Sequence, residues 1–291
     1  MLGPTAAGKS DLGLRLAEDV GGVILSVDSM QVYRGMDIGT AKPSQADRAR
    51  VVHHMIDLVE PTEPYSVAEF QGEARRLLEQ EDRPMVIVGG SGLHFRAVVD
   101  PMVFPPHDAE LRGRLESMAD PVAALVSADP TAAEHVDLAN RRRVVRALEA
   151  VVITGRGAGE RLATAEADAV RSYRSLYDFR AVVVDPGDDL SRRIGLRLAE
   201  MRGRGLLDEV RGLRGRMGRT AAAAVGYRQL LPVTEGTIAE DQGWAEVERA
   251  TRALARRQRT YFRRDPRLRW VAWHEDPERR YQAVRDGLEQ S

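Results

Sequence analysis

The sequence predicts an α/β protein in which a parallel sheet of the phosphate-loop type is flanked by helices and interrupted by a helical insertion. Two observations predict this fold. Short apolar runs rich in β-branched residues alternate with amphipathic segments in the first hundred residues, which is the order expected of a parallel sheet. The stretch GPTAAGKS at residues 3–10 also fits the pattern G-x-x-x-x-G-K-[ST], which normally joins a strand to a helix.

Composition indicates a globular protein. The chain has 291 residues, 43% of them hydrophobic and 30% charged, which is enough for one large domain or two modest ones. We find no apolar run near the length of a membrane span and no charged-then-apolar leader. Cysteine is absent, which excludes disulfides and thiol nucleophiles. We therefore expect a cytoplasmic monomer with no membrane partner.

The first elements of the core follow from periodicity. Residues 9–19 have helical spacing of apolar side chains, and residues 23–27 form a buried strand that ends just before Asp28. A second helix is predicted over 68–81 and a second strand over 84–88, which leads into GGSG at residues 89–92. Ligands of parallel sheets lie beyond the carboxyl ends of the strands. The phosphate loop, Asp28 and residues 89–92 should therefore share one edge.

The organisation changes at residues 101–106, which contain three prolines. From 108 to 171 the chain is helical and rich in Ala and Arg, so we predict a helical insertion there and a core made of residues 1–107 and 172–291. A strand returns at 179–185, helices are predicted over 190–213 and 245–264, and a last strand over 268–273.

Only Met1 and Leu2 precede the loop, where a strand is expected. The neighbours of a missing central strand would keep unpaired backbone groups inside a buried sheet. We therefore expect that the first strand is truncated here and that about five apolar residues lie upstream.

The loop predicts a polyphosphate ligand, without choosing between ATP, GTP and another diphosphate. Its glycines let backbone N–H groups face phosphate oxygens, Lys9 can reach the distal phosphate and Ser10 can bind Mg²⁺. Asp28 can accept a proton or help to hold Mg²⁺, and a turn cap explains it equally well. The next strand ends without a carboxylate, which weakens the interpretation as a plain triphosphatase.

Basic residues indicate a nucleic acid. Only two of the 43 basic residues, Lys9 and Lys42, are lysine, and a lysine differs from an arginine at a crowded phosphate. Arginines recur at steps of three and four along the 245–264 helix, with Glu246 and Glu248 as its only acids, and a second cluster occupies 141–146. Unbalanced arginines fit a phosphate backbone. Tyr227 either stacks on a base or lies in the core. We interpret His53-His54 as structural.

Eight motifs occur in order along almost the whole chain: GPTAAGKS, SVDSMQVYRGMDIGTAKP, HHMIDLVEP, YSVAEF, GGSGLHFRA, RRVVRALE, AVGYRQ and RRQRTYFRRD. Together they resemble those of the tRNA dimethylallyltransferases (tRNA isopentenyltransferases). The segment from residue 28 to residue 43 is the most specific, and it gives Lys42 a place in a motif.

The resemblance implies transfer of a dimethylallyl group from dimethylallyl diphosphate to N6 of the adenosine 3′ to the anticodon of tRNA (adenosine 37), with Mg²⁺ as cofactor. The residues that it implies for the diphosphate are Gly3, Pro4, Thr5, Ala6, Ala7, Gly8, Lys9 and Ser10, the last also toward Mg²⁺. Thr5, Lys9 and Arg96 would neutralise the leaving diphosphate, and Asp28 would be the general base. Those implied for the extruded adenine are Asp28, Ser29, Met30, Gln31 and Ser91. Those implied for the anticodon stem-loop are Arg112, Arg142, Arg143, Val144, Val145, Arg146, Gly226, Tyr227 and Arg228.

Three residues depart from the family pattern, which usually has Thr at Ser91, Tyr at His94 and Trp at Tyr261. Ser91 keeps the hydroxyl, whereas His94 is expected to reshape the pocket. Three alternatives stay open: an adenylate isopentenyltransferase acting on free nucleotide, a phosphate-loop small-molecule kinase, and a non-catalytic RNA-binding protein. The basic clusters disfavour the first. The missing strand-end acid disfavours the second, and the third leaves the phosphate loop without a role.

Overall fold

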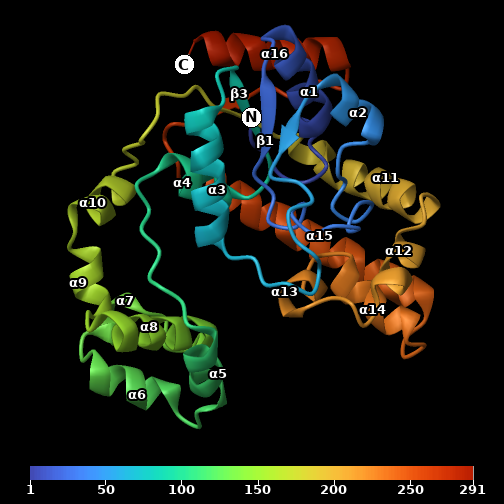
Figure 1. Cartoon of the computed structure of the whole chain (residues 1–291). Helices are drawn as coiled ribbons and strands as arrows, with labels where there is room; N and C mark the ends of the chain where they lie inside the picture. The colour runs from blue at the N-terminus through green and yellow to red at the C-terminus, as the bar shows by residue number, and fades with distance from the viewer. Residues whose placement is uncertain (291) are drawn as a thin grey trace. The chain divides into compact units, whose positions relative to one another are not determined.

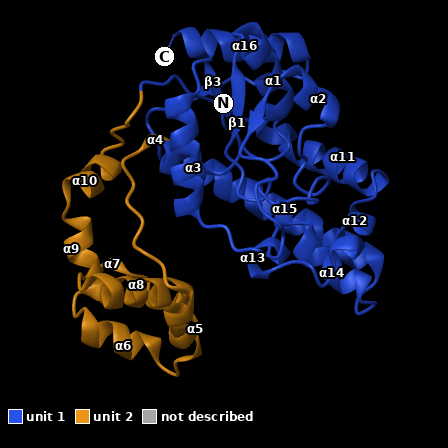
Figure 2. Ribbon diagram, viewed as in Figure 1, with its two compact units in different colours: residues 1–98, 178–291 blue, residues 99–177 orange. Residues whose placement is uncertain are grey.

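The computed structural model describes residues 1–290 and divides into two compact units (Figures 1 and 2). The first unit comprises Met1–Val98 and Asp178–Ser291, and the second comprises Val99–Tyr177. The predicted insertion covers residues 108–171. The second unit is longer, because it also includes residues 99–107 and 172–177 on either side.

The first unit is built on short parallel strands. They are β1 (Val23–Ser26), β2 (His53–His54), β3 (Met85–Val88), β4 (Val182–Val184) and β5 (Arg269–Val271). β1 lies between β2 and β3, while β4 pairs with β5. The strands expected over 23–27, 84–88, 179–185 and 268–273 are confirmed. The two histidines form β2, and their interpretation as structural residues stays a prediction.

Leu2 connects these two groups of strands. Its N–H donates to the carbonyl of Val182 over 2.9 Å, and its carbonyl accepts from Val184 N over 2.9 Å. It also makes a parallel bridge to Gly89, directly after β3. Leu2 is fully buried. A residue at the strand position expected before the phosphate loop therefore lies between β3 and β4.

Met1 is buried beside it. Its carbonyl accepts from Gly89 N over 3.2 Å, and its α-amino group donates to the Ile87 carbonyl over 2.6 Å. Burial, assisted by the charge of Lys9, lowers the pKa of this amino group to about 5. The expectation of further strand residues upstream stays a prediction.

The helices of the first unit are α1 (Lys9–Asp19), α2 (Gln45–Arg50), α3 (Val67–Gln80), α4 (Gly92–Val99), α11 (Leu190–Gly203), α12 (Leu206–Leu213), α13 (Arg219–Ala222), α14 (Tyr227–Thr234), α15 (Glu240–Phe262) and α16 (Pro277–Glu289), with a 3₁₀ turn at Gly187–Asp189. The helix expected over 190–213 is divided in two. Gly205 has φ 88°, a left-handed conformation that interrupts an α-helix and favours glycine.

α1 and α16 lie side by side against the sheet (Figure 1). Arg15 donates to both carboxylate oxygens of Glu278, at 2.6 and 2.9 Å, and the Tyr281 hydroxyl donates to Asp19. Apolar side chains of both helices pack with those of β4 in one buried cluster. This packing fixes the helix that follows the phosphate loop.

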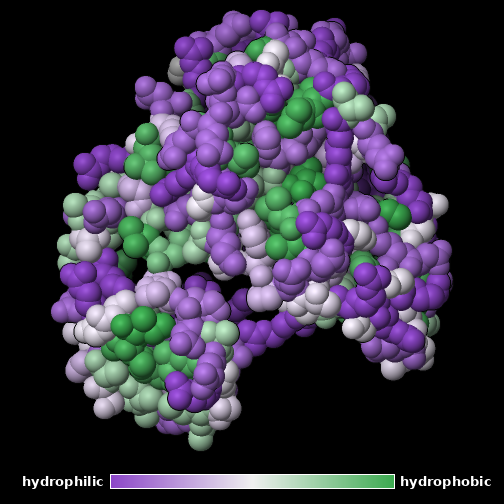
Figure 3. Space-filling view, viewed as in Figure 1, coloured by the Kyte–Doolittle hydropathy of each residue, from purple (hydrophilic) through white to green (hydrophobic). Residues whose placement is uncertain are grey.

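The second unit is helical. Its helices are α5 (Ala109–Ser117), α6 (Pro121–Ala128), α7 (Ala132–His135), α8 (Arg141–Thr154), α9 (Ala158–Leu162) and α10 (Ala165–Arg171). Its core is formed by side chains such as Leu115, Leu125 and Leu148. Among residues 1–290, no helix is long and apolar enough to cross a membrane. Hydrophilic side chains cover most of the face in Figure 3, and hydrophobic ones gather in small separate areas.

Candidate active site

The phosphate loop leads directly into α1. Ala6 has φ 63° and Gly8 has φ 78°, so the backbone turns sharply before the helix begins at Lys9. A Cβ at Gly3 would lie 2.2 Å from the Val184 carbonyl oxygen, which leaves room only for glycine there. Lys9 folds back on the loop, with its Nζ donating to the Pro4 carbonyl over 2.6 Å.

A cavity of about 470 Å³ lies beside this loop. The predicted site residues that line it are Thr5, Lys9, Ser10, Asp28, Ser29, Met30, Gln31, Ser91 and Gly226. The structure therefore brings the phosphate loop, the segment after β1 and the turn after β3 to one place. Arg96 lies in α4 and is not among the residues that line this cavity, so its role stays a prediction.

Lys9 is influenced by a positive charge on Arg197 and a negative charge on Asp28. Burial, followed by the charge of Arg197, lowers the pKa of Lys9 to about 7, and Asp28 opposes this shift. Burial also lowers the pKa of Arg197, again against the effect of Asp28. Arg197, from α11, lines the cavity. A bound anion would therefore meet two cations here, one of which titrates near neutral pH.

Asp28 follows β1 at the carboxyl end of the strand. Its Oδ1 accepts from the Met30 N–H over 2.8 Å, which is the turn cap that the sequence left open. The charge of the same carboxylate opposes the lowering of the pKa of both Lys9 and His94, so it acts on both neighbours. Asp28 thus caps its turn and also lines the cavity.

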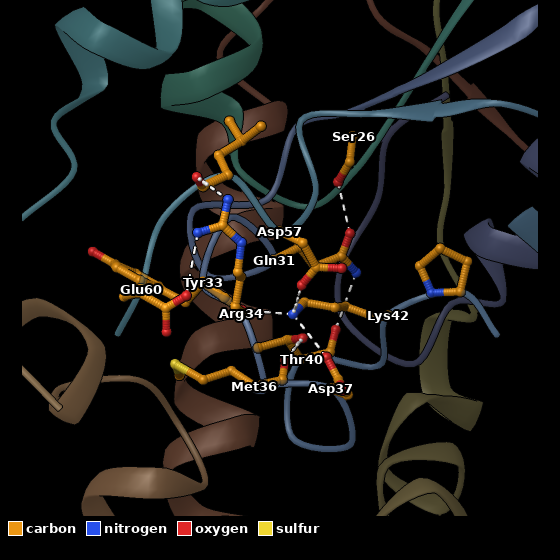
Figure 4. A network of polar contacts seen from close by, with 12 residues as sticks. Ser26, Gln31, Tyr33, Arg34, Met36, Asp37, Thr40, Lys42, Asp57 and Glu60 are labelled. Carbon is orange, nitrogen blue, oxygen red and sulfur yellow. Dashed lines mark hydrogen bonds and ion pairs between the residues drawn. The ribbon is translucent and has the colours of Figure 1, made fainter. Parts of the chain in front are cut away.

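Gln31 has a fixed side-chain amide (Figure 4). Its Oε1 accepts from Ser26 Oγ over 2.7 Å, and its Nε2 donates to the carbonyls of Thr40 and Ala41 over 3.1 and 3.3 Å. Both amide hydrogens are used, so the group can offer a ligand only an oxygen lone pair.

Lys42 is a structural residue. Its side chain is 1% exposed, and its Nζ donates to Asp57 (2.5 Å), Asp37 (2.8 Å) and the Tyr33 carbonyl (2.5 Å), as Figure 4 shows. It does not line the cavity. The second lysine of the chain thus holds the loop after Asp28 from inside, because a buried charge needs such partners.

Ser91 and His94 form a pair on the turn after β3. The Ser91 Oγ lies 2.7 Å from His94 Nδ1, and the histidine ring stands edge-on to Phe70 with 4.7 Å between the centroids. Burial lowers the pKa of His94 to about 4, against the effect of Asp28. The ring is therefore neutral at pH 7, and its tautomer decides which of the two groups donates the hydrogen bond between His94 and the Ser91 hydroxyl.

α15 contacts this turn more closely than its sequence indicates. Gln258 accepts from Thr5 N over 2.8 Å and donates to the Gly90 carbonyl over 2.9 Å. A Cβ at Gly92 would lie 2.1 Å from the Tyr261 ring. Gln258 and Arg197 are two polar cavity residues that the sequence analysis did not assign to the site. The motif RRQRTYFRRD contains the first, and no local pattern singles out the second.

The arginine stripe on α15 is only partly available. Arg249 pairs with Glu246, Arg252 with Glu248, and Arg259 with Asp185, from outside the helix. Arg263 stacks over Trp270 at 5.7 Å. The expectation of unbalanced arginines along this helix is therefore wrong for Arg249, Arg252 and Arg259, which acidic partners neutralise, whereas Arg263 keeps its charge beside the Trp270 ring.

Three further arginines lie in the C-terminal half of α15 and just after it. Arg256, Arg257 and Arg264 are exposed and have no acidic partner within residues 1–290. Together with Thr260 they line a concavity of about 380 Å³, and Arg257 lines the main cavity as well. The unbalanced basic surface therefore adjoins the site.

Gly226 and Tyr227, two other residues implied for contact with tRNA, are buried. The ring of Tyr227 is fully buried and its hydroxyl donates to Glu209 over 2.5 Å. Stacking of this ring on a base is therefore wrong, and the core alternative is confirmed. Next to it, Gly226 lines the main cavity and Arg228 is exposed.

The second unit holds the remaining predicted contacts. Val144 and Val145 are 0% and 2% exposed within its core, so side-chain contact between these two and a ligand is ruled out. Arg112 forms an ion pair with the buried Glu149. Its charge, like that of Arg142, lowers the pKa of Arg146 in addition to burial. Arg112, Arg142 and Arg146 therefore form one cluster of net positive charge, in which Glu149 neutralises Arg112, whereas Arg143 lies 3.7 Å from Asp137.

Comparisons with known proteins identify the family. The IPP transferase family model matches residues 31–265. The tRNA dimethylallyltransferase of Streptomyces avermitilis is 44% identical over 285 residues, which cover 94% of this chain and 89% of that protein. The solved tRNA isopentenylpyrophosphate transferase of Bacillus halodurans has a TM-score of 0.69 at 32% identity and covers 99% of this chain and 95% of that one. A second solved transferase, from Staphylococcus epidermidis, has a TM-score of 0.71 at 27% identity, covering 100% and 98%. The resemblance in the motifs is thereby confirmed, and the chain belongs to the IPP transferase family.

Proposed function

We propose that the protein transfers the dimethylallyl group of dimethylallyl diphosphate to N6 of the adenosine 3′ to the anticodon in tRNA. The observation that carries this proposal is that one cavity is lined by both of the expected binding segments. Residues of the phosphate loop and the Asp28–Gln31 segment line the same cavity of about 470 Å³, so a diphosphate and an acceptor base can meet there.

The donor would bind through its charge and its chain. Lys9, Arg197 and the backbone of the phosphate loop provide the cationic end. The apolar side chains that line the cavity suit a five-carbon allyl group, and they include Leu14, Leu198, Met201, Leu206, Val247 and Leu254.

In the reaction, N6 of adenine attacks C1 of the allyl group. The N6–C1 bond forms, the C1–O bond breaks and its electron pair leaves with the diphosphate, beside Lys9 and Arg197. The N6 proton passes to the carboxylate of Asp28, which acts as general base. Gln31 and Ser91, which line the cavity together with Asp28, would hold the adenine.

Mg²⁺ is the metal that fits the donor set. Residues 1–290 contain no cluster of three acidic or histidine side chains that would hold an ion by themselves. Mg²⁺ prefers phosphate oxygens and water with few protein ligands, and Ser10 lines the cavity with an exposed side chain. When bound, the ion would supply neutralisation of the diphosphate charge.

The arginines support an RNA substrate. Arg256, Arg257 and Arg264 adjoin the main cavity, where the backbone flanking an extruded base would lie. In the second unit, Arg112, Arg142 and Arg146 give a further positive cluster, and we propose this unit as the domain that grips the anticodon stem-loop. The proposal includes a cytoplasmic monomer, in keeping with a chain without cysteine.

The direct test is prenylation in vitro. The protein is incubated with dimethylallyl diphosphate, Mg²⁺ and unmodified tRNA, and the nucleosides are analysed by mass spectrometry. We expect dimethylallyladenosine at the position 3′ to the anticodon. A parallel reaction with AMP tests the free-nucleotide alternative, and one with ATP tests phosphoryl transfer. Folded protein that leaves tRNA unchanged would refute the proposal.

A further inference from the structure

The side chain of Glu209 accepts hydrogen bonds from the backbone of the loop that follows Gln31. One carboxylate oxygen accepts from the N–H groups of Asp37 (2.9 Å) and Ile38 (2.8 Å), and the other accepts from Gly39 N (3.1 Å). Three successive amides thus point at one side chain of α12, about 170 residues away in the sequence. Charge-assisted bonds of this kind are stronger than neutral ones.

Tyr227 completes this contact from α14. Its hydroxyl donates over 2.5 Å to the Glu209 oxygen that also accepts from Gly39. The tyrosine ring lies so close to the loop that a Cβ at Gly39 would be 2.4 Å from it. Burial raises the pKa of the Tyr227 hydroxyl, as does the charge of Glu209, so the group stays protonated and donates. We call Glu209 and Tyr227 the loop anchor.

The anchored loop leads directly to the cavity. Gly39 is followed by Thr40 and Ala41, whose carbonyls accept both hydrogen bonds from the Gln31 amide. All four of these residues line the cavity. The orientation of the Gln31 amide therefore depends on where residues 40 and 41 are held. A shift of that loop would release the amide, since its other bond, from Ser26, fixes only the oxygen.

Two sets of hydrogen bonds support this loop, one from within its own segment and one from distant helices. Lys42 holds it from within, through Asp37 and Asp57, as Figure 4 shows. The loop anchor instead ties it to α12 and α14, outside the segment that surrounds Lys42. Loss of the loop anchor should therefore loosen residues 37–41 without exposing the buried lysine.

We propose that Glu209 is a positioning residue for base recognition: by fixing the amides of residues 37–39 it holds Gln31 in the orientation that accepts the target adenine. The inference rests on the proposed function. Glu209 touches neither substrate in this scheme and acts through the loop.

The first measurement needs no substrate. Hydrogen exchange of the peptide covering residues 36–42 is compared in wild type, Glu209→Gln and Tyr227→Phe. Glutamine keeps one acceptor oxygen but turns an NH₂ toward the amides, so we expect exchange at 37–39 to accelerate about 10-fold or more. Tyr227→Phe removes one bond and should have a smaller effect. The matched control is Asp208→Asn, an exposed neighbour on α12 that pairs with Arg211.

The second measurement separates positioning from folding. With tRNA as substrate we expect KM to rise about 10-fold in Glu209→Gln with a smaller change in kcat, while the affinity for inorganic pyrophosphate stays within twofold. A merely structural role would weaken pyrophosphate binding and tRNA binding together, and that result would overturn the inference. So would wild-type exchange and kinetics in Glu209→Gln. Wild-type protein that makes no product refutes the proposed function instead, and the exchange data then decide the loop anchor alone.

Discussion

The backbone N–H of Thr5 donates to the side-chain oxygen of Gln258 over 2.8 Å, across 253 residues of sequence. The amide nitrogen of the same glutamine donates to the Gly90 carbonyl over 2.9 Å. One side chain of α15 therefore joins the phosphate loop to the turn after β3. Both joined segments line the cavity.

We expect Gln258→Leu to weaken binding of inorganic pyrophosphate about 10-fold, or about 1.4 kcal/mol, because the phosphate loop loses its support before the ligand arrives. Titration calorimetry measures this directly. Gln282→Leu is the matched control, since Gln282 is exposed on α16 and bonds only Asp286 in the same helix. Equal affinities for the two variants would contradict the prediction.

Diphosphate binding should be linked to proton uptake by Lys9. With its pKa lowered to about 7, Lys9 is partly neutral in the unliganded protein at pH 7.5. An anion favours the charged form and raises this pKa, so binding takes up a proton and affinity falls as pH rises above about 7. Calorimetry in buffers of different ionisation enthalpy detects this uptake.

Lys9→Arg supplies the control for that measurement. An arginine stays charged throughout, so the part of the pH dependence that belongs to Lys9 should vanish while the ligand's own titration remains. Identical proton uptake in the two proteins would show that Lys9 is already fully charged.

Asp28→Asn should lower turnover at least about 100-fold while tRNA affinity changes less than about twofold. Asparagine keeps the oxygen that accepts from Met30 N, so the turn is preserved and only the proton acceptor is lost. Single-turnover prenylation and filter binding measure the two quantities. Unchanged turnover would remove Asp28 from the role of base.

The unpaired arginines in and just after α15 should contact phosphate. Arg256→Ala and Arg264→Ala should each reduce the slope of log affinity for tRNA against log salt by about 1. Arg249→Ala removes the same charge from the same helix, but Arg249 is paired with Glu246, so its slope should stay near that of wild type. If all three variants lose equally, net charge rather than position is responsible.

Local pattern was sufficient for much of this fold. The helix over residues 9–19, the strands around it and the glycine loop follow from spacing and residue type, and the structure has them there. Helical periodicity also separates the valines of the 141–146 cluster from its arginines, a distinction that the interpretation as one contact surface overlooked. Val144 and Val145 occupy the buried face of α8, whereas Arg142, Arg143 and Arg146 face outward.

Other features depend on which distant segments meet. Arg197 and Glu209 act on residues from the first hundred of the chain, and nothing in their own neighbourhoods marks them, while the motif that contains Gln258 does not reveal its partners. For Lys42 the sequence marks the residue but does not reveal its role. Its rarity indicates importance, but only its partners reveal that it supports a loop instead of a phosphate.

The near-absence of lysine gives the protein a natural chemical probe. Of the two lysines in residues 1–290, Lys42 has a buried side chain, which is 1% exposed. Lys9 remains, at the cavity wall and with a pKa of about 7, so that much of it is nucleophilic in neutral solution. An acylating reagent at pH 7.5 should therefore modify one lysine, and protection from labelling would report occupancy of the phosphate loop without any engineered tag.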